Sequence, residues 1–193
     1  TGGTRGILWN GYNPGNRNDI EYINVDTTGN AVDFGNSTVT ARQRTSCASR
    51  TRSLAAMGYT DAYLNTIDYI TIASTGNAAD FGDLLSGRQT SPPGFNSIRC
   101  VFGGNYSNVL EFITTATTGN SIDFGDLVYR PGHPHSASSP TRGVWQGGKQ
   151  SPEGLTNICE YIEIMTLGNS KDFGDLTLAR SAGGSTSNGH GGL

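Results

Sequence analysis

Short stretches in which apolar or aromatic residues alternate with polar ones recur along the chain. The stretch IDYITIAS, which begins at Ile67, is rich in β-branched and aromatic residues and lies between Asn-Thr and Thr-Gly-Asn. This pattern predicts a β-strand. Related stretches are IEYINVDT from Ile20, LEFITTAT from Leu110 and CEYIEIMT from Cys159. No segment has the 3.6-residue period of an amphipathic helix, so the pattern favours an all-β protein.

A turn signature follows each of these stretches. The string Thr-Gly-Asn-x-x-Asp-Phe-Gly occurs at 28–35, 75–82 and 118–125, and at 167–174 it begins with Leu-Gly-Asn. Gly and Asn tolerate positive φ, which predicts a tight turn. The glycine of Asp-Phe-Gly then predicts a bulge or a close backbone approach as a second strand begins. The recurring residues are Asp33, Asp80, Asp123 and Asp172, and Phe34, Phe81, Phe124 and Phe173.

A segment that starts with arginine and ends in small residues precedes each stretch, as in TRGVWQGG. Its arginines are Arg5, Arg52, Arg99 and Arg142. With a Ser/Thr-rich strand between units, each repeat of about 48 residues has four short antiparallel strands. Such a sheet cannot bury both faces alone, so the units are expected to stack, as propeller blades of this length do. We predict a single domain over 1–193, an all-β four-bladed β-propeller with repeats at about 5–51, 52–98, 99–141 and 142–189. A solenoid is the alternative.

Composition and charge narrow the range of partners. The chain of 193 residues has 28 glycines, only 15% charged residues and a net charge of −3 at pH 7. Because nucleic-acid binders carry a basic excess, we expect no nucleic-acid partner. No run approaches about 18 consecutive apolar residues, so no membrane insertion is expected. The chain begins at Thr1 rather than Met, which leads us to expect a processed form or a piece of a longer protein.

The order of these motifs resembles a Kelch-type blade, which has a Gly-Gly doublet after its second strand, a Tyr in the third and an aromatic in the fourth. Gly103-Gly104 and Gly147-Gly148 match the doublet, whereas Asn10-Gly11 and Met57-Gly58 depart from it. The string IDYITIASTGNAADFGDL is also similar to repeats in virion structural proteins of environmental phages, cyanophages especially. The resemblance implies a structural role, extracellular or on a virion surface, and carries over no catalytic residue.

Each repeat also contributes one acidic strand residue and two arginines. The acidic residues are Glu21, Asp68, Glu111 and Glu160. The arginine pairs are Arg5 with Arg42, Arg52 with Arg88, Arg99 with Arg130, and Arg142 with Arg180. We expect Arg–carboxylate pairs that fix neighbouring blades in register. A ring of arginines that binds an anion in a central channel is the alternative.

The Asp-Phe-Gly tripeptide invites two metal hypotheses. A kinase is excluded because the tripeptide occurs four times without a glycine-rich nucleotide loop or a His-Arg-Asp loop. Turn oxygens suit Ca²⁺, and Asn77, Asp80 and Asp83 form the best set. The first repeat has Asn36 in place of Asp83, however, and capping of turn amides explains the same residues. We therefore expect no cofactor, with calcium as the alternative.

The histidines and cysteines give only weak indications of metal binding or catalysis. His133 and His135 lie in a Pro-rich loop with no acidic or Cys partner nearby, and no Gly-x-Ser-x-Gly elbow marks a nucleophile, so we expect no enzyme. Cys47, Cys100 and Cys159 fit no zinc or redox spacing. At most one pair can bridge, and small buried thiols are the expectation.

Loops of differing length and polarity separate the small residues from the acidic strands. They carry Tyr12, Tyr59, Tyr63 and Tyr106. Loops at one end of a repetitive scaffold often carry binding specificity. Aromatic rings stack on sugar faces while Asn amides bind hydroxyls, which predicts a carbohydrate ligand. Packing against the next blade is the alternative.

The final segment, SAGGSTSNGHGGL from Ser181, occupies the first-strand position of a following repeat. It would close a ring beside the N-terminal strand or pair with the next subunit as a donated strand. We expect a non-enzymatic structural or adhesive protein outside the cell, on a virion or in a filament, that self-associates or binds other virion or surface proteins. A lectin-like module is the alternative.

Overall fold

The computed structural model describes residues 3–88, 91–150, 152 and 154–187, and their regular structure is β-strand. No helix of membrane-spanning length and apolarity occurs among them. The strands are β1 (Arg5–Tyr12), β2 (Asn16–Asn24), β3 (Val32–Ala41), β4 (Thr45–Ala48), β5 (Arg52–Ala56), β6 (Leu64–Thr71), β7 (Ala79–Arg88), β8 (Gly94–Phe95), β9 (Arg99–Phe102), β10 (Val109–Thr114), β11 (Ile122–Asp126), β12 (His135–Ser138), β13 (Arg142–Gln150), β14 (Gly154–Glu163) and β15 (Lys171–Asp175).

These strands form four small antiparallel sheets in chain order: β1–β3, β4–β7, β8–β11 and β12–β15. The predicted all-β fold is confirmed, and the sheets are consistent with four propeller-like blades. Among the described residues, the first sheet has three of the four strands predicted per blade, and each of the other three sheets has four. In that sheet β1 is an edge strand, because it pairs with β2 alone among the described strands. The Ser/Thr-rich strand β4 pairs with β5 and so belongs to the second sheet.

Every sheet has a bulge at its Asp-Phe-Gly. In the first sheet Ile20 lies opposite Gly35 and Glu21 lies opposite Asp33, which leaves Phe34 as an extra residue. The same register shift falls between Ile67 and Asp68, Leu110 and Glu111, and Cys159 and Glu160. Gly35 has a φ of +144°, a conformation open mainly to glycine. The bulge predicted from the sequence is confirmed, and it explains the glycine.

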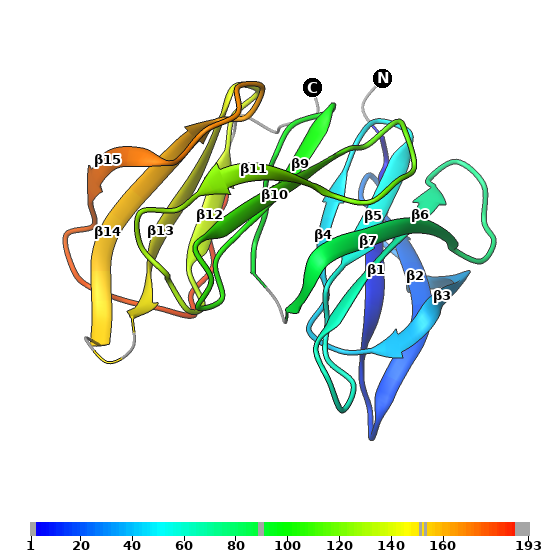
Figure 1. The fold of residues 1–193 in the computed structure, drawn as a ribbon. Coiled ribbons are helices and arrows are strands. Elements are labelled where there is room, and N and C mark those ends of the chain that lie inside the picture. Colours follow the sequence, from blue (N-terminus) through cyan, green and yellow to red (C-terminus); the bar gives the residue numbers. More distant parts are fainter. Residues whose placement is uncertain (1–2, 89–90, 151, 153, 188–193) are drawn as a thin grey trace.

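The four sheets follow one another through the molecule rather than mixing. Figure 1 shows the first sheet (blue) at one end and the fourth (yellow to orange) at the other, with the second and third between them. Consecutive sheets meet through their last strands, where β7 contacts both β3 and β11. The third and fourth sheets also meet where β8 contacts β12 and β13.

The hydrophobic core lies between sheets. One buried cluster joins Leu54 and Phe81 of the second sheet to Phe102 of the third, and another joins Phe124 of the third sheet to Trp145 of the fourth. A smaller cluster joins the first sheet to the second. Each repeat therefore depends on its neighbours for burial, as in repeat arrays.

The cysteines differ from the expectation of three small thiols. Cys47 of β4 and Cys100 of β9 form a disulfide, with a Cα–Cα separation of 6.6 Å. The bond joins the second sheet to the third inside their shared cluster. Cys159 is buried and unpaired, and burial raises the pKa of its thiol, with a further rise from nearby Asp175.

The described part of the C-terminal segment runs beside β12 of the fourth sheet. The Ser187 hydroxyl donates to the Ser138 carbonyl at 2.6 Å, and the Ser185 hydroxyl donates to the Ser136 carbonyl. The Gly183 amide donates to His135 Nε2 at 3.3 Å. These hydrogen bonds place the segment against the last sheet. The rest of the segment, NGHGGL at 188–193 with His190, lies outside the described residues.

Candidate functional site

The recurring sequence motifs meet at three junctions between consecutive repeats. At each one, the Gly-Asn turn of a repeat lies on the Asp-Phe-Gly edge of the repeat before it. The Gly76 amide donates to the Phe34 carbonyl at 2.7 Å, Gly119 to Phe81 at 2.7 Å, and Gly168 to Phe124 at 2.8 Å. Two residues further along the turn, the amides of Ala78, Ser121 and Ser170 donate to the carbonyls of Asn36, Asp83 and Asp126, each at 2.8 Å. The junction is thus a short ladder of backbone hydrogen bonds.

The asparagine of each turn completes this ladder. Asn77 Oδ1 accepts the Asn36 amide, Asn120 Oδ1 the Asp83 amide, and Asn169 Oδ1 the Asp126 amide, each at 3.0 Å. A Cβ at Gly35 would overlap the backbone of Gly76. Glycine is therefore required there by the close approach as well as by its φ.

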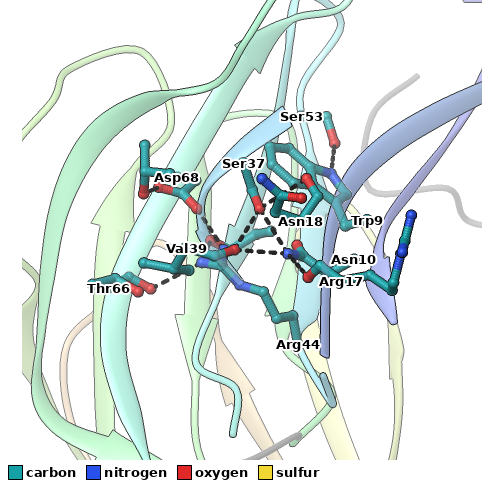
Figure 2. Close-up of polar contacts among 12 residues, drawn as sticks. Trp9, Asn10, Arg17, Asn18, Ser37, Val39, Arg44, Ser53, Thr66 and Asp68 are labelled. Atoms are coloured by element: carbon teal, nitrogen blue, oxygen red, sulfur yellow. Dashed lines mark hydrogen bonds and ion pairs between the residues drawn. The ribbon is translucent and has the colours of Figure 1, made fainter. Parts of the chain in front are cut away.

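Three of the four acidic strand residues are buried at the same junctions and bind the preceding repeat. Asp68 is fully buried and accepts Arg44 Nη1 and the Thr38 hydroxyl, each at 2.5 Å. Figure 2 shows Arg44 reaching Asp68. Arg44 also donates to the Ala55 carbonyl at 2.7 Å. Burial lowers the pKa of Arg44, and the Asp68 carboxylate opposes that shift.

The next two junctions vary this arrangement. Glu111, fully buried, forms an ion pair with Arg88 and accepts the Leu85 amide at 2.6 Å. Burial lowers the pKa of Arg88, and Glu111 opposes that shift. Glu160 accepts the amides of Val128 and Tyr129 at 2.8 and 3.0 Å instead of an arginine. All three junctions have a buried carboxylate that accepts hydrogen bonds from the preceding repeat. These hydrogen bonds compensate part of the free-energy cost of burying the charge.

The arginine that opens each repeat lies over an aromatic ring of its own sheet. Arg5, Arg52, Arg99 and Arg142 stand 4.5–4.7 Å from the ring centroids of Tyr22, Tyr69, Phe112 and Tyr161. Those rings in turn meet the phenylalanines of Asp-Phe-Gly edge to face. The first three arginines also donate to a carbonyl of the following repeat: that of Ile72, Thr115 or Ile164. These side chains therefore both pack their own sheet and tie it to the next.

Within the described part of the chain, the two ends of the array lack these partners. Phe173 is 55% exposed, whereas Phe34, Phe81 and Phe124 are 2–3% exposed. Glu21 is exposed, unlike the other three strand acids. Arg142 forms an exposed ion pair with Glu163 at 2.8 Å in place of a bond to a following repeat, and this hydrogen bond raises the pKa of Arg142.

Two of the four loop tyrosines lie against one arginine, and a third packs on one of them. The Arg42 guanidinium lies 5.2 Å from the Tyr12 ring centroid and 4.9 Å from that of Tyr59. Tyr59 meets Tyr63 at 5.6 Å, with the rings inclined at 61°. Tyr106 lies elsewhere, edge to face with His133. The structure therefore makes one aromatic surface from Tyr12, Arg42, Tyr59 and Tyr63, called the tyrosine patch below.

The residues considered for metal binding either hold backbone amides or are exposed at the surface. The Asn77 oxygen holds the Asn36 amide, and Asp80 is exposed. Asp33, Asp123 and Asp172 are exposed as well. Within the described ranges, no group of three or more His, Cys, Asp or Glu side chains is placed to hold a metal ion.

The sequence pattern did not predict Arg44 as the partner of Asp68, because Arg42 lies closer than Arg44 to the offset from Asp-Phe-Gly at which Arg88 stands. The structure shows that Arg42 belongs to the tyrosine patch. Arg130 and Arg180 are both exposed. Arg180 stands at the same offset from its Asp-Phe-Gly as Arg88, which is the one signal that relates the two.

No protein-family model matches this chain, and no match is found among curated protein sequences.

Proposed function

We propose that this chain is a non-enzymatic structural or adhesive repeat protein, a component of a virion or of an extracellular filament that assembles through its blade-like sheets. The observation that carries the proposal is the use of the recurring polar residues. The buried carboxylates Asp68, Glu111 and Glu160 all take hydrogen bonds from a preceding repeat. Residues that suggested chemistry in the sequence thus have a structural task.

Two further features support a place outside the cell. The Cys47–Cys100 disulfide is a bond that persists mainly in oxidising compartments. The motif order resembles Kelch-type blades, and the repeat string is similar to repeats of phage virion proteins. On this proposal the partners are further copies of the chain or other virion or surface proteins.

Negative-stain microscopy of the purified chain over a series of rising concentrations tests this proposal. Ordered polymers of uniform width are the expected result. Isolated particles of one size at every concentration would overturn self-assembly as the function.

Carbohydrate binding is the second candidate, and the tyrosine patch favours it. Tyr12 and Tyr63 are 62% and 55% exposed and flank the more buried Tyr59. Two exposed rings in one patch with the Arg42 cation suit a glycan with an acidic group, because rings stack on sugar faces while the guanidinium binds carboxylate or sulfate.

A glycan array compares the natural chain with the double variant Tyr12→Ala/Tyr63→Ala. The expected result is binding that the double variant loses and that Tyr106→Ala retains, since Tyr106 lies outside the patch. The candidate fails if the natural chain binds no glycan, or if the double variant binds as well as the natural chain.

A further inference from the structure

Each repeat has two contact faces, and three of the four copies of each face are used within the chain. The leading face is the Gly-Asn turn with the strand acid, and the trailing face is the Asp-Phe-Gly edge with the residues that follow it. At the three internal junctions a leading face lies on a trailing face. The leading face of the first repeat and the trailing face of the fourth have no such partner among the described residues.

The free trailing face, in the fourth repeat, has the same motif as the internal trailing faces, but no described turn lies on it. Phe173 is 55% exposed. A Cβ at Gly174 would meet nothing within 4 Å, whereas one at Gly35, Gly82 or Gly125 would overlap the next turn. Among described residues, none donates an amide to the Phe173 carbonyl as Gly168 does to Phe124. An exposed strand edge with an aromatic side chain and no covering element is a site for pairing with another chain.

The free leading face carries the matching groups. Gly29, Asn30 and Glu21 are exposed in the first repeat. They stand where Gly168, Asn169 and Glu160 stand in the fourth. Terminal repeats of monomeric arrays normally present a polar cap, but Val32 beside this turn is apolar and 51% exposed, as Ile122 is at the same position of the internal third repeat, at 61%. Both ends therefore keep the form of internal repeats.

A third match involves the missing strand of the first sheet. In the fourth sheet β12 pairs with β13 and lies beside β8 of the third, where the Ser136 hydroxyl donates to the Pro93 carbonyl at 2.9 Å. The Ser185 hydroxyl makes the same kind of bond to Ser136. Residues 183–187 thus hold the place of a first strand for a fifth sheet. Among the strands that the structure describes, the first sheet is the one that lacks such a partner.

We propose that the trailing face of the fourth repeat docks onto the leading face of the first repeat in a second copy of this chain, head to tail. In the register of the internal junctions, Phe173 O accepts Gly29 N, and Asp175 N donates to Asn30 Oδ1. Residues 183–187 pair with β1 of that copy and complete its first sheet. The inference rests on the proposed function, since it names the surfaces through which the filament forms.

Charge gives the contact its specificity. Arg180 is exposed and matches Arg88, which pairs with the buried Glu111. Glu21 is exposed and stands in the position of Glu111 in its own repeat. In the head-to-tail register Arg180 of one copy therefore faces Glu21 of the next. Within one copy the first and fourth sheets lie at opposite ends of the molecule (Figure 1), so we assign this contact to two copies. Such a heterologous contact builds filaments or multi-copy rings.

Charge reversal tests the pairing. Glu21→Arg and Arg180→Glu should each raise the concentration needed for assembly about 100-fold, because like charges then face each other. The double variant Glu21→Arg/Arg180→Glu should assemble again. An equimolar mixture of the two single variants should also assemble, because opposite charges meet wherever a copy of one variant docks onto a copy of the other. Sedimentation velocity and negative-stain microscopy measure each case.

The matched controls are Asp61→Arg and Lys149→Glu, which reverse exposed charges away from both faces. Both should assemble like the natural chain. If the natural chain assembles and the single reversals assemble equally well, this docking surface is wrong while the proposed function stands. If the single reversals abolish assembly and neither the double variant nor the mixture restores it, the pairing of Glu21 with Arg180 is wrong. If the natural chain never assembles, the proposed function fails.

Discussion

The edges of the second and fourth repeats share the sequence Asp-Phe-Gly-Asp-Leu but have opposite surroundings. In β7, Phe81 is 3% exposed, and a Cβ at Gly82 would strike the turn of the third repeat. In β15, Phe173 is 55% exposed and the space before Gly174 is open. The ring contacts to Tyr69 and Tyr161 are nearly the same, at 5.8 and 5.9 Å. The motif thus fixes the shape of the edge, and the following repeat supplies its burial.

Truncation of the two phenylalanines should give the largest difference. Phe81→Ala should lower the free energy of unfolding by about 3–5 kcal/mol, the range for a buried Phe. Phe173→Ala should lower it by about 1 kcal/mol or less, because more than half of that ring is already in water. Urea unfolding in dilute solution, where copies stay apart, measures both. Equal losses would show that the ring contact within each sheet, rather than the next repeat, stabilises the edge.

The strand acids extend the comparison to charge. Glu111→Gln should cost about 3 kcal/mol, because it leaves the buried Arg88 without its counter-ion. Glu21→Gln should change stability by no more than about 0.5 kcal/mol, since Glu21 is exposed. Thermal and urea unfolding of the two variants measure the difference. A large loss with Glu21→Gln would mean that the first repeat buries its acid without a neighbour.

The turn asparagines should give the smallest difference. Asn120→Ala removes the acceptor of the Asp83 amide and should cost about 1 kcal/mol or less. Asn30→Ala should be neutral to within about 0.5 kcal/mol in dilute solution, because no described donor reaches Asn30. Amide hydrogen exchange adds a local measure: Asp83 should lose protection in Asn120→Ala and keep it in Asn30→Ala. An unchanged exchange rate of the Asp83 amide in Asn120→Ala would show that the asparagine does not stabilise the junction.

Local features of this fold could be predicted from the sequence. Of the long-range pairings, an Arg–carboxylate pair between neighbouring repeats, as in Arg88 with Glu111, could be expected, and the others could not. IDYITIAS and Thr-Gly-Asn predict a strand and a turn from their own residues, and the glycine of Asp-Phe-Gly predicts its bulge. The choice of Arg44 over Arg42 as the partner of Asp68 depends on where β3 ends against the second sheet. The Cys47–Cys100 pair and the tyrosine patch join residues from different sheets or loops, and the spacing of those residues in the chain holds no trace of either.

The Cys47–Cys100 disulfide has a mechanical consequence for an assembly of such chains. A pulling force transmitted from one end of the array to the other crosses the second and third sheets through this bond. The 53-residue separation that it spans is then shielded from extension. Reduction should release up to about 190 Å of additional contour length per molecule in force spectroscopy, at about 3.6 Å per residue. In the oxidised protein, the segment between Cys47 and Cys100 would therefore not extend under force, whereas the first and fourth repeats could unfold and extend.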